Sequence, residues 1–190
     1  MKKRSEVIFD KSVAAAISAI ELYNKPDFKY REESFVILLV NAWELLLKAK
    51  ILQESNNKLI SLYSKEPKKN KKGEKTKKLV YKLNRSKGRQ TIDLFKAIGA
   101  LAKKGFKLDE RCYQNIEAIT EIRDNAIHLC NSEKMLNKKI QELGAASLKN
   151  YLNLIKKWFD EKLSEKLASF NFYLMPMSFL MNLGKLMELA

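Results

Sequence analysis

The 190-residue sequence has few of the residues that make turns, disulfides and metal sites. It contains 6 Gly and 3 Pro, which is little for a fold of many short strands and tight turns. Its two cysteines, Cys112 and Cys130, form no CxxC pair. The sequence has one histidine, His128, and the common zinc patterns need more Cys and His ligands than these. These shortages argue against a disulfide framework, a metal site and a cofactor. They favour a few long helices in a protein of the reducing cytoplasm.

The sequence also lacks the long apolar runs of export signals and membrane spans. Glu6 and Asp10 interrupt the N-terminal stretch before it can form the apolar core of a signal peptide. The most apolar stretch, 35–52, carries charged residues such as Glu44 and Lys48, so it does not predict a span. P-loop, GxGxxG and HExxH motifs are absent too, which argues against energy-coupled and redox enzymes.

Positive charge is what the sequence has in excess. Lys and Arg number 37 against 22 Asp and Glu, which gives a net charge of +15. Such an excess predicts an anionic partner, either a nucleic acid or an acidic membrane surface. The basic residues concentrate in a run that has no apolar face, and this favours RNA over a membrane.

The spacing of apolar residues predicts an all-α fold of about five helices. We expect helices at about 5–24, 31–54, 91–104, 110–129 and 133–168. Gly105 is placed to end the third helix, and Asp109 and Ser132 are placed to cap the next two. The 31–54 helix is the most apolar, so we expect it at the centre of the bundle.

Between the second and third predicted helices lies a basic insertion, residues 61–90. It holds twelve basic residues against two acidic ones, which is two thirds of the net charge. A segment of this kind can bind RNA phosphates, and a solvated disordered loop is the alternative. Tyr63 and Tyr81 could stack on bases, although two tyrosines alone make no platform. The candidate RNA-binding residues of the insertion are Lys68, Lys69, Lys71, Lys72, Lys75, Lys77, Lys78, Arg85 and Arg89.

The candidate catalytic residues lie around the single histidine, in the stretch Glu-Ile-Arg-Asp-Asn-Ala-Ile-His that ends at His128. Histidine titrates near neutral pH and can give or take a proton. The planar guanidinium of Arg123 matches phosphate oxygens. Five helical steps place the two residues about 140° apart, so they could meet on a phosphate in a cleft or across a dimer. The alternative is that His128 is only a helix-end residue and that Arg123 pairs with a neighbouring Glu.

These residues, in a helical bundle, resemble the HEPN superfamily (higher eukaryotes and prokaryotes nucleotide-binding domain). Its ribonucleases carry an Arg, four to six residues and then a His, usually with a polar residue after the Arg, as Arg123, Asp124 and His128 do. The stretch 35–50, which contains Ala-Trp-Glu-Leu-Leu-Leu-Lys-Ala, is similar to an earlier helix of a bacterial HEPN-like family described only as a domain of unknown function. The resemblance covers about residues 5–165.

The resemblance implies a homodimeric, metal-independent endoribonuclease. His128 would act as general acid or base, Arg123 would stabilise phosphate charge, and Asn125 would bind the phosphate or orient His128. Glu44 could hold either catalytic residue and Lys48 could contact phosphate; an ordinary helix pair is the alternative for these two. Many members are toxins or antiviral defence proteins, so a restraining antitoxin or another regulatory partner is expected.

The resulting domain prediction is a bundle over 1–168, interrupted by the insertion, and an apolar appendage at 169–190. The appendage would be a packing or interface element, in a chain that could belong to a longer protein. The competing function is a non-catalytic module that binds nucleic acid or a toxin–antitoxin partner through the insertion.

Overall fold

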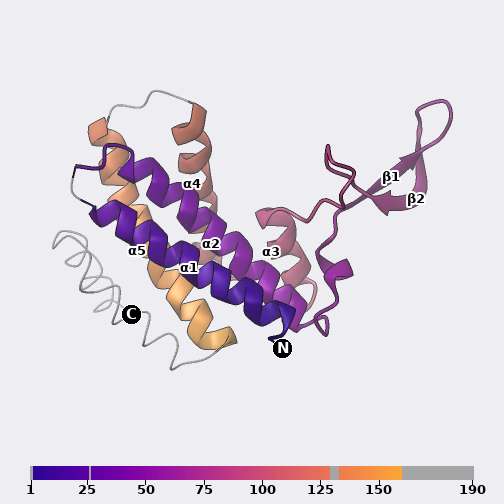
Figure 1. Cartoon of the computed structure of the whole chain (residues 1–190), viewed down its shortest axis with the longest axis horizontal. Helices are drawn as coiled ribbons and strands as arrows, with labels where there is room; N and C mark the ends of the chain where they lie inside the picture. Colours follow the sequence, from indigo (N-terminus) through magenta and orange to yellow (C-terminus); the bar gives the residue numbers. More distant parts are fainter. Residues whose placement is uncertain (1, 26, 129–132, 160–190) are drawn as a thin grey trace. The chain divides into compact units, whose positions relative to one another are not determined.

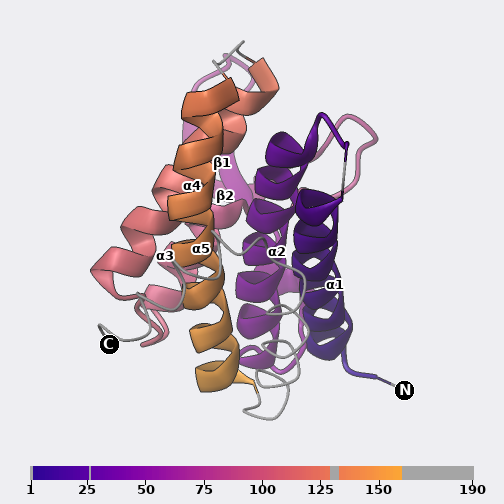
Figure 2. The same ribbon diagram turned by 90° about the vertical axis from the view of Figure 1, so that its left-hand side faces the viewer.

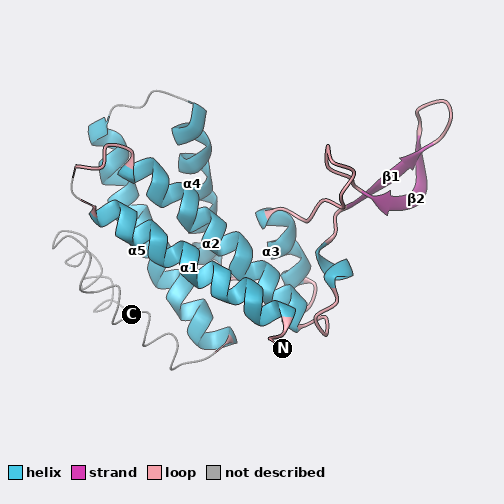
Figure 3. Cartoon of the chain, in the orientation of Figure 1, coloured by secondary structure: helices cyan, strands magenta, loops and turns pink. Residues whose placement is uncertain are grey.

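The computed structural model describes residues 2–25, 27–128 and 133–159. Their fold is mostly helical with one small two-stranded sheet (Figures 1 and 3). The prediction of a mostly helical protein is therefore confirmed. The predicted all-α class was incomplete, because the insertion forms two strands. Within these residues, no helix is both long and apolar enough to cross a membrane.

The chain divides into two compact units. The first combines the start of the chain through Phe9 with Leu46–Lys107, and the second combines Asp10–Leu45 with the chain from Leu108 onward. The predicted boundary at 168 and the appendage at 169–190 lie outside the described residues, so that division stays a prediction.

The second unit is built on four helices, α1 (Arg4–Asn24), α2 (Arg31–Gln53), α4 (Glu110–His128) and α5 (Glu133–Trp158). The first two helices also run into the first unit. Figure 2 shows α1 beside α2 and α4 beside α5. The predicted helices match these bounds closely; the end predicted near 168 and the capping Ser132 lie outside the described residues. Large apolar side chains fill this unit, and Phe35, Leu39 and Ile116 are fully buried, as the apolar periodicity predicted.

A buried polar network links three of these helices. The Trp43 indole Nε1 donates to Ser147 Oγ at 2.8 Å, and its ring meets that of Tyr151 edge-on at a centroid distance of 5.4 Å. Ser12 Oγ donates to the Ala42 carbonyl at 2.6 Å and lies 2.7 Å from the Tyr151 hydroxyl. A serine hydroxyl has one proton, so Tyr151 must donate to Ser12. Burial raises the pKa of Tyr151, which keeps that proton in place.

The first unit contains α3 (Leu94–Ala102), the short 3₁₀ helix η1 (Leu59–Leu62) and the last turns of α2. Helix α3 is shorter than the predicted 91–104, because the Asp93 carboxylate caps it by accepting from Lys96 N at 2.9 Å. Thr91 instead pairs with Tyr63 in an isolated β-bridge. Lys50 is buried but paired, with Glu54 at 2.8 Å.

Gly105 ends α3 as the sequence predicted, in a left-handed conformation with φ +89°. Gly105 N donates to the Ala102 carbonyl and Phe106 N to the Leu101 carbonyl, at 3.1 and 3.0 Å. This pair of hydrogen bonds is the Schellman motif, which favours glycine at the left-handed residue.

Two glycine-to-alanine changes in this region are expected to have opposite effects. Gly105→Ala should lower the free energy of unfolding by about 1 kcal/mol, since a Cβ is strained in the left-handed region. Gly99→Ala should raise it by about 0.5–1 kcal/mol, because Gly99 is inside α3 and alanine is the better helix former. A Cβ at either position would meet nothing within 4 Å. The two changes in the free energy of unfolding therefore reflect backbone conformation and not side-chain clashes. Urea titrations of both variants followed by circular dichroism check the result; equal shifts would contradict it.

The basic insertion forms an ordered β-hairpin, which the sequence-based prediction missed. Strand β1 (Lys65–Lys69) pairs antiparallel with β2 (Lys75–Tyr81), with Lys65 opposite Tyr81. Asn70 Oδ1 accepts from the backbone N of Lys72 and of Glu74 at 2.9 Å, and Gly73 supplies the positive φ of the turn, +84°. The alternative of a disordered loop therefore does not describe this segment.

Candidate functional site: the Arg123 helix end and the basic hairpin

Helix α4 carries the predicted catalytic segment at its C-terminal end. Ile116 and Ile119 are fully buried and anchor one face of the helix in the second unit. Asn115, one position before this stripe, donates from Nδ2 to the Leu143 carbonyl of α5 at 3.1 Å. Packing and this hydrogen bond fix α4 against α5, so the residues that follow extend from a well-held helix.

Arg123 lies on the line of the buried stripe, four residues after Ile119, and its side chain is 29% exposed. Its Nε and Nη2 atoms contact Asp124 Oδ1 at 2.9 and 2.7 Å. The Asp124 side chain is 60% exposed. The ion pair with the neighbouring carboxylate orients the guanidinium, and partial exposure leaves it within reach of a ligand.

His128 is the last residue of α4, and its side chain lies outside what the structure describes. Both Arg123 and His128 therefore stand on the same helix, and the 140° separation expected from helical periodicity applies to their backbone positions. Asn125 lies between them and is half-buried. Helix geometry alone does not bring the two functional groups onto one face.

Glu44, the predicted support for the pair, lies half-buried on α2 in the second unit. It follows Trp43, whose indole is hydrogen-bonded to α5. The ion pair described for Arg123 goes to Asp124, so support from Glu44 stays a prediction.

The candidate RNA-binding residues of the insertion belong to the first unit and are exposed. Every residue of β1 is exposed, and exposed positions also dominate β2. All nine basic residues predicted to bind RNA here are exposed. A hairpin with lysines on both strands and no buried face is a concentrated, accessible positive surface.

Lys48, the tenth predicted RNA contact, has a different environment. Its side chain is 7% exposed and Nζ donates to Thr91 Oγ1 at 2.9 Å, next to the base of the hairpin. In this structure the Lys48 ammonium is buried and hydrogen-bonded to Thr91, and its charge is not presented on the surface. The hydrogen bond between Lys48 and Thr91 was not predicted, because nothing in the sequence relates positions 48 and 91.

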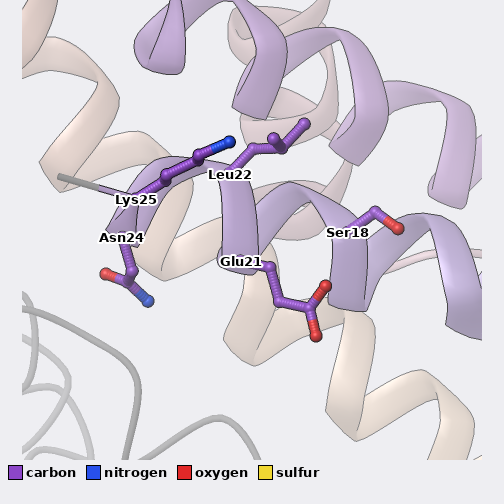
Figure 4. Close-up of a pocket in the computed structure, with 5 residues that line it drawn as sticks. All are labelled: Ser18, Glu21, Leu22, Asn24 and Lys25. Atoms are coloured by element: carbon purple, nitrogen blue, oxygen red, sulfur yellow. The ribbon is translucent and has the colours of Figure 1, made fainter. Parts of the chain in front are cut away.

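A pocket and a buried thiol also occur among the described residues, away from the predicted site residues. A pocket of about 570 Å³ is lined by Ser18, Glu21, Leu22 and Asn24 on the last turns of α1 and by Lys25 directly after the helix (Figure 4). None of the predicted site residues lines it. Among the described side chains, no three His, Cys, Asp or Glu gather as a metal ion would require. Burial raises the pKa of Cys112 to about 11, so this thiol is a poor nucleophile at neutral pH.

Comparison with known proteins yields one match. The family model described as "Domain of unknown function (DUF3644)" matches residues 7–187. No curated protein and no solved structure matches the chain. The match covers both units and both candidate regions, the helix end at 123–128 and the hairpin. The chain belongs to the DUF3644 family.

Proposed function

We propose that this protein is a metal-independent endoribonuclease of the HEPN type, with Arg123 and His128 as its catalytic pair. One observation carries the proposal: the only histidine of the chain ends the helix on which a partly exposed arginine is held in place. The exposed basic hairpin supports an RNA substrate, because it supplies the positive surface that a polyanion requires.

The chemistry requires one proton to leave and another to arrive. A ribose 2′-hydroxyl attacks the adjacent phosphorus, its proton passes to a base, and the bond from phosphorus to the 5′-oxygen breaks. An acid protonates that oxygen, which leaves a 2′,3′-cyclic phosphate and a 5′-hydroxyl. His128 serves as general acid or base in this scheme, and Arg123 stabilises the negative charge that builds up on the phosphate.

The neighbours of Arg123 have supporting roles. Asp124 holds the guanidinium by its two contacts to Nε and Nη2, which leaves the remaining donors of the fork for phosphate oxygens. Asn125, half-buried between the catalytic pair, supplies an amide for the phosphate or for the orientation of His128. Glu44 and Lys48 complete the predicted set, Glu44 at the catalytic pair and Lys48 through its hydrogen bond to Thr91.

Residues 140° apart on one helix could meet on a phosphate in a cleft or across a dimer, and the resemblance to HEPN ribonucleases is what favours the dimer. In a homodimer, Arg123 of one copy and His128 of the other can face one phosphate. A cytoplasmic toxin or antiviral effector restrained by an antitoxin is the biological role that this activity would suit.

The test is a cleavage assay on total RNA and transfer RNA in the presence of EDTA. We expect the wild-type protein to cut and to leave cyclic phosphate ends, which mass spectrometry of the fragments detects. Cleavage that EDTA abolishes, or products with 5′-phosphate ends, would refute the proposed mechanism.

A second function is favoured by the exposed hairpin: a module that binds nucleic acid without cutting it. The two functions respond differently to mutation. Neutralising Lys75, Lys77 and Lys78 would weaken a binding module, whereas a nuclease would also depend on His128 for turnover while keeping its affinity for RNA.

A further inference from the structure

Three chain segments meet at the base of the basic hairpin through backbone hydrogen bonds. Lys82 N donates to the Ser64 carbonyl at 2.9 Å, Gln90 N to the Lys82 carbonyl at 2.8 Å, and Ser64 N to the Gln90 carbonyl at 2.9 Å. The three bonds form a closed ring, and its member Ser64 is buried. A junction of this kind fixes the backbone of all three segments.

The residues that precede the three members of this ring carry side chains that contact one another. They are Tyr63, Tyr81 and Arg89. The two tyrosine rings meet edge-on with centroids 5.8 Å apart, and the Arg89 guanidinium carbon lies 4.5 Å from the Tyr81 centroid and 5.3 Å from that of Tyr63. Lys65 Nζ also lies 5.7 Å from the Tyr81 centroid. The cluster thus combines two aromatic rings with two cations.

Arg89 also ends a second turn, which begins at Leu83. Leu83 and Arg89 form an isolated β-bridge, and between them Asn84 Oδ1 accepts from Gly88 N at 2.7 Å. Arg89 is nevertheless an exposed residue, whereas both tyrosines are half-buried. The guanidinium is therefore oriented by aromatic rings beneath it while it remains accessible to a ligand.

We infer that this cluster is a subsite for an unpaired nucleobase of a single-stranded RNA. The base stacks on the Arg89 guanidinium, whose plane Tyr81 and Tyr63 hold in position, and Lys65 and the strand lysines bind the adjoining phosphates. Stacking of bases on arginine planes and aromatic rings is a common basis of single-strand recognition. The pre-oriented guanidinium lowers the entropic cost of that contact.

The chemistry of the cluster favours a single strand over the other polyanions. A duplex hides its base faces in the helical stack, so it could use only the lysines. An acidic membrane would likewise offer phosphate groups to the lysines but no base to stack on Arg89. This inference rests on the proposed function, which makes RNA the substrate. It adds that the hairpin binds RNA in its single-stranded form.

The experiment measures binding with the full-length His128→Ala protein, which is not expected to consume the probe. Fluorescence anisotropy compares a labelled unstructured RNA 12-mer with the duplex of the same sequence, over a range of salt concentrations. We expect the single strand to bind about tenfold more tightly. Arg89→Lys keeps the charge but removes the stacking plane, so it should weaken single-strand binding about tenfold, leave duplex binding unchanged and keep the salt dependence. Tyr81→Leu should act like Arg89→Lys.

Arg111→Lys is the matched control, because Arg111 is an exposed arginine on α4 that is not among the predicted RNA-binding residues. It should change neither affinity. Equal binding of single strand and duplex, an Arg89→Lys effect no larger than that of Arg111→Lys, or Arg89-dependent binding to acidic vesicles would overturn the inference. Each of these outcomes is independent of cleavage, so the nuclease proposal stands or falls separately on the assay of product ends.

Discussion

His128→Ala is expected to reduce RNA cleavage by about 10²–10⁴-fold, the usual contribution of a general acid or base. RNA affinity should stay the same, because the exposed lysines that we propose bind the RNA belong to the hairpin and not to α4. Single-turnover cleavage rates and anisotropy on the same labelled RNA measure the two quantities. Loss of both would show that the substitution damages the fold, and loss of neither would refute the catalytic role.

Variants of Arg123 and Asp124 separate charge from geometry at the same site. Arg123→Lys keeps the positive charge but loses the fork, so cleavage should fall by about tenfold to a hundredfold. Asp124→Asn removes the carboxylate that contacts Nε and Nη2. If Asp124 orients the guanidinium, its loss should lower the cleavage rate but less than the loss of Arg123. A faster Asp124→Asn protein would mean that the ion pair competes with phosphate.

The long helices were predictable because each repeats its apolar signal over several turns. The prediction of 31–54 compares with Arg31–Gln53 in the structure. Their ends were also predictable where a side chain makes the cap, as at Asp109, whose Oδ1 accepts from Arg111 N at 2.9 Å. Local chemistry decides these features, so one sequence is enough to locate them.

The hairpin was not predictable from hydrophobic pattern because it has almost none. Every residue of β1 is exposed, so no alternation of apolar and polar residues marks the strand. The usable signal was the turn, where Asn70 precedes Gly73 between two lysine-rich runs. Likewise, the meeting of Tyr63, Tyr81 and Arg89 depends on backbone hydrogen bonds between distant segments, which no local pattern encodes.

The candidate catalytic residues were located by the rarity of histidine and by a family resemblance. The structure agrees with the predicted helix and adds its packing and the Asp124 ion pair. It also changes the view of Lys48, whose charge was expected at a phosphate and is instead hydrogen-bonded to Thr91 in a buried position. Burial of a lysine on an apolar helix follows from tertiary packing, which the sequence of that helix does not reveal.

Trp43→Ala is expected to cause the largest loss of stability of any single substitution considered. Trp43 is fully buried in the second unit, packs edge-on against Tyr151 and donates to Ser147. Truncation of a buried tryptophan removes apolar contacts and leaves a cavity, which costs about 3–5 kcal/mol. Because a folded domain is stable by only about 5–15 kcal/mol, this variant should unfold at a much lower urea concentration, as measured by far-ultraviolet circular dichroism.

Three milder variants assign that loss to its causes. Trp43→Phe keeps most of the packing but leaves the Ser147 hydroxyl, itself fully buried, without its indole donor, so we expect a cost of about 1–3 kcal/mol. Ser147→Ala in the Trp43→Phe background removes the unpaired hydroxyl and should restore part of that loss. Tyr151→Phe should cost about 1 kcal/mol, because Ser12 still donates to the Ala42 carbonyl after the phenol is gone. If Trp43→Phe were as destabilising as Trp43→Ala, the hydrogen bond to α5 and not the packing of the indole would hold this core together.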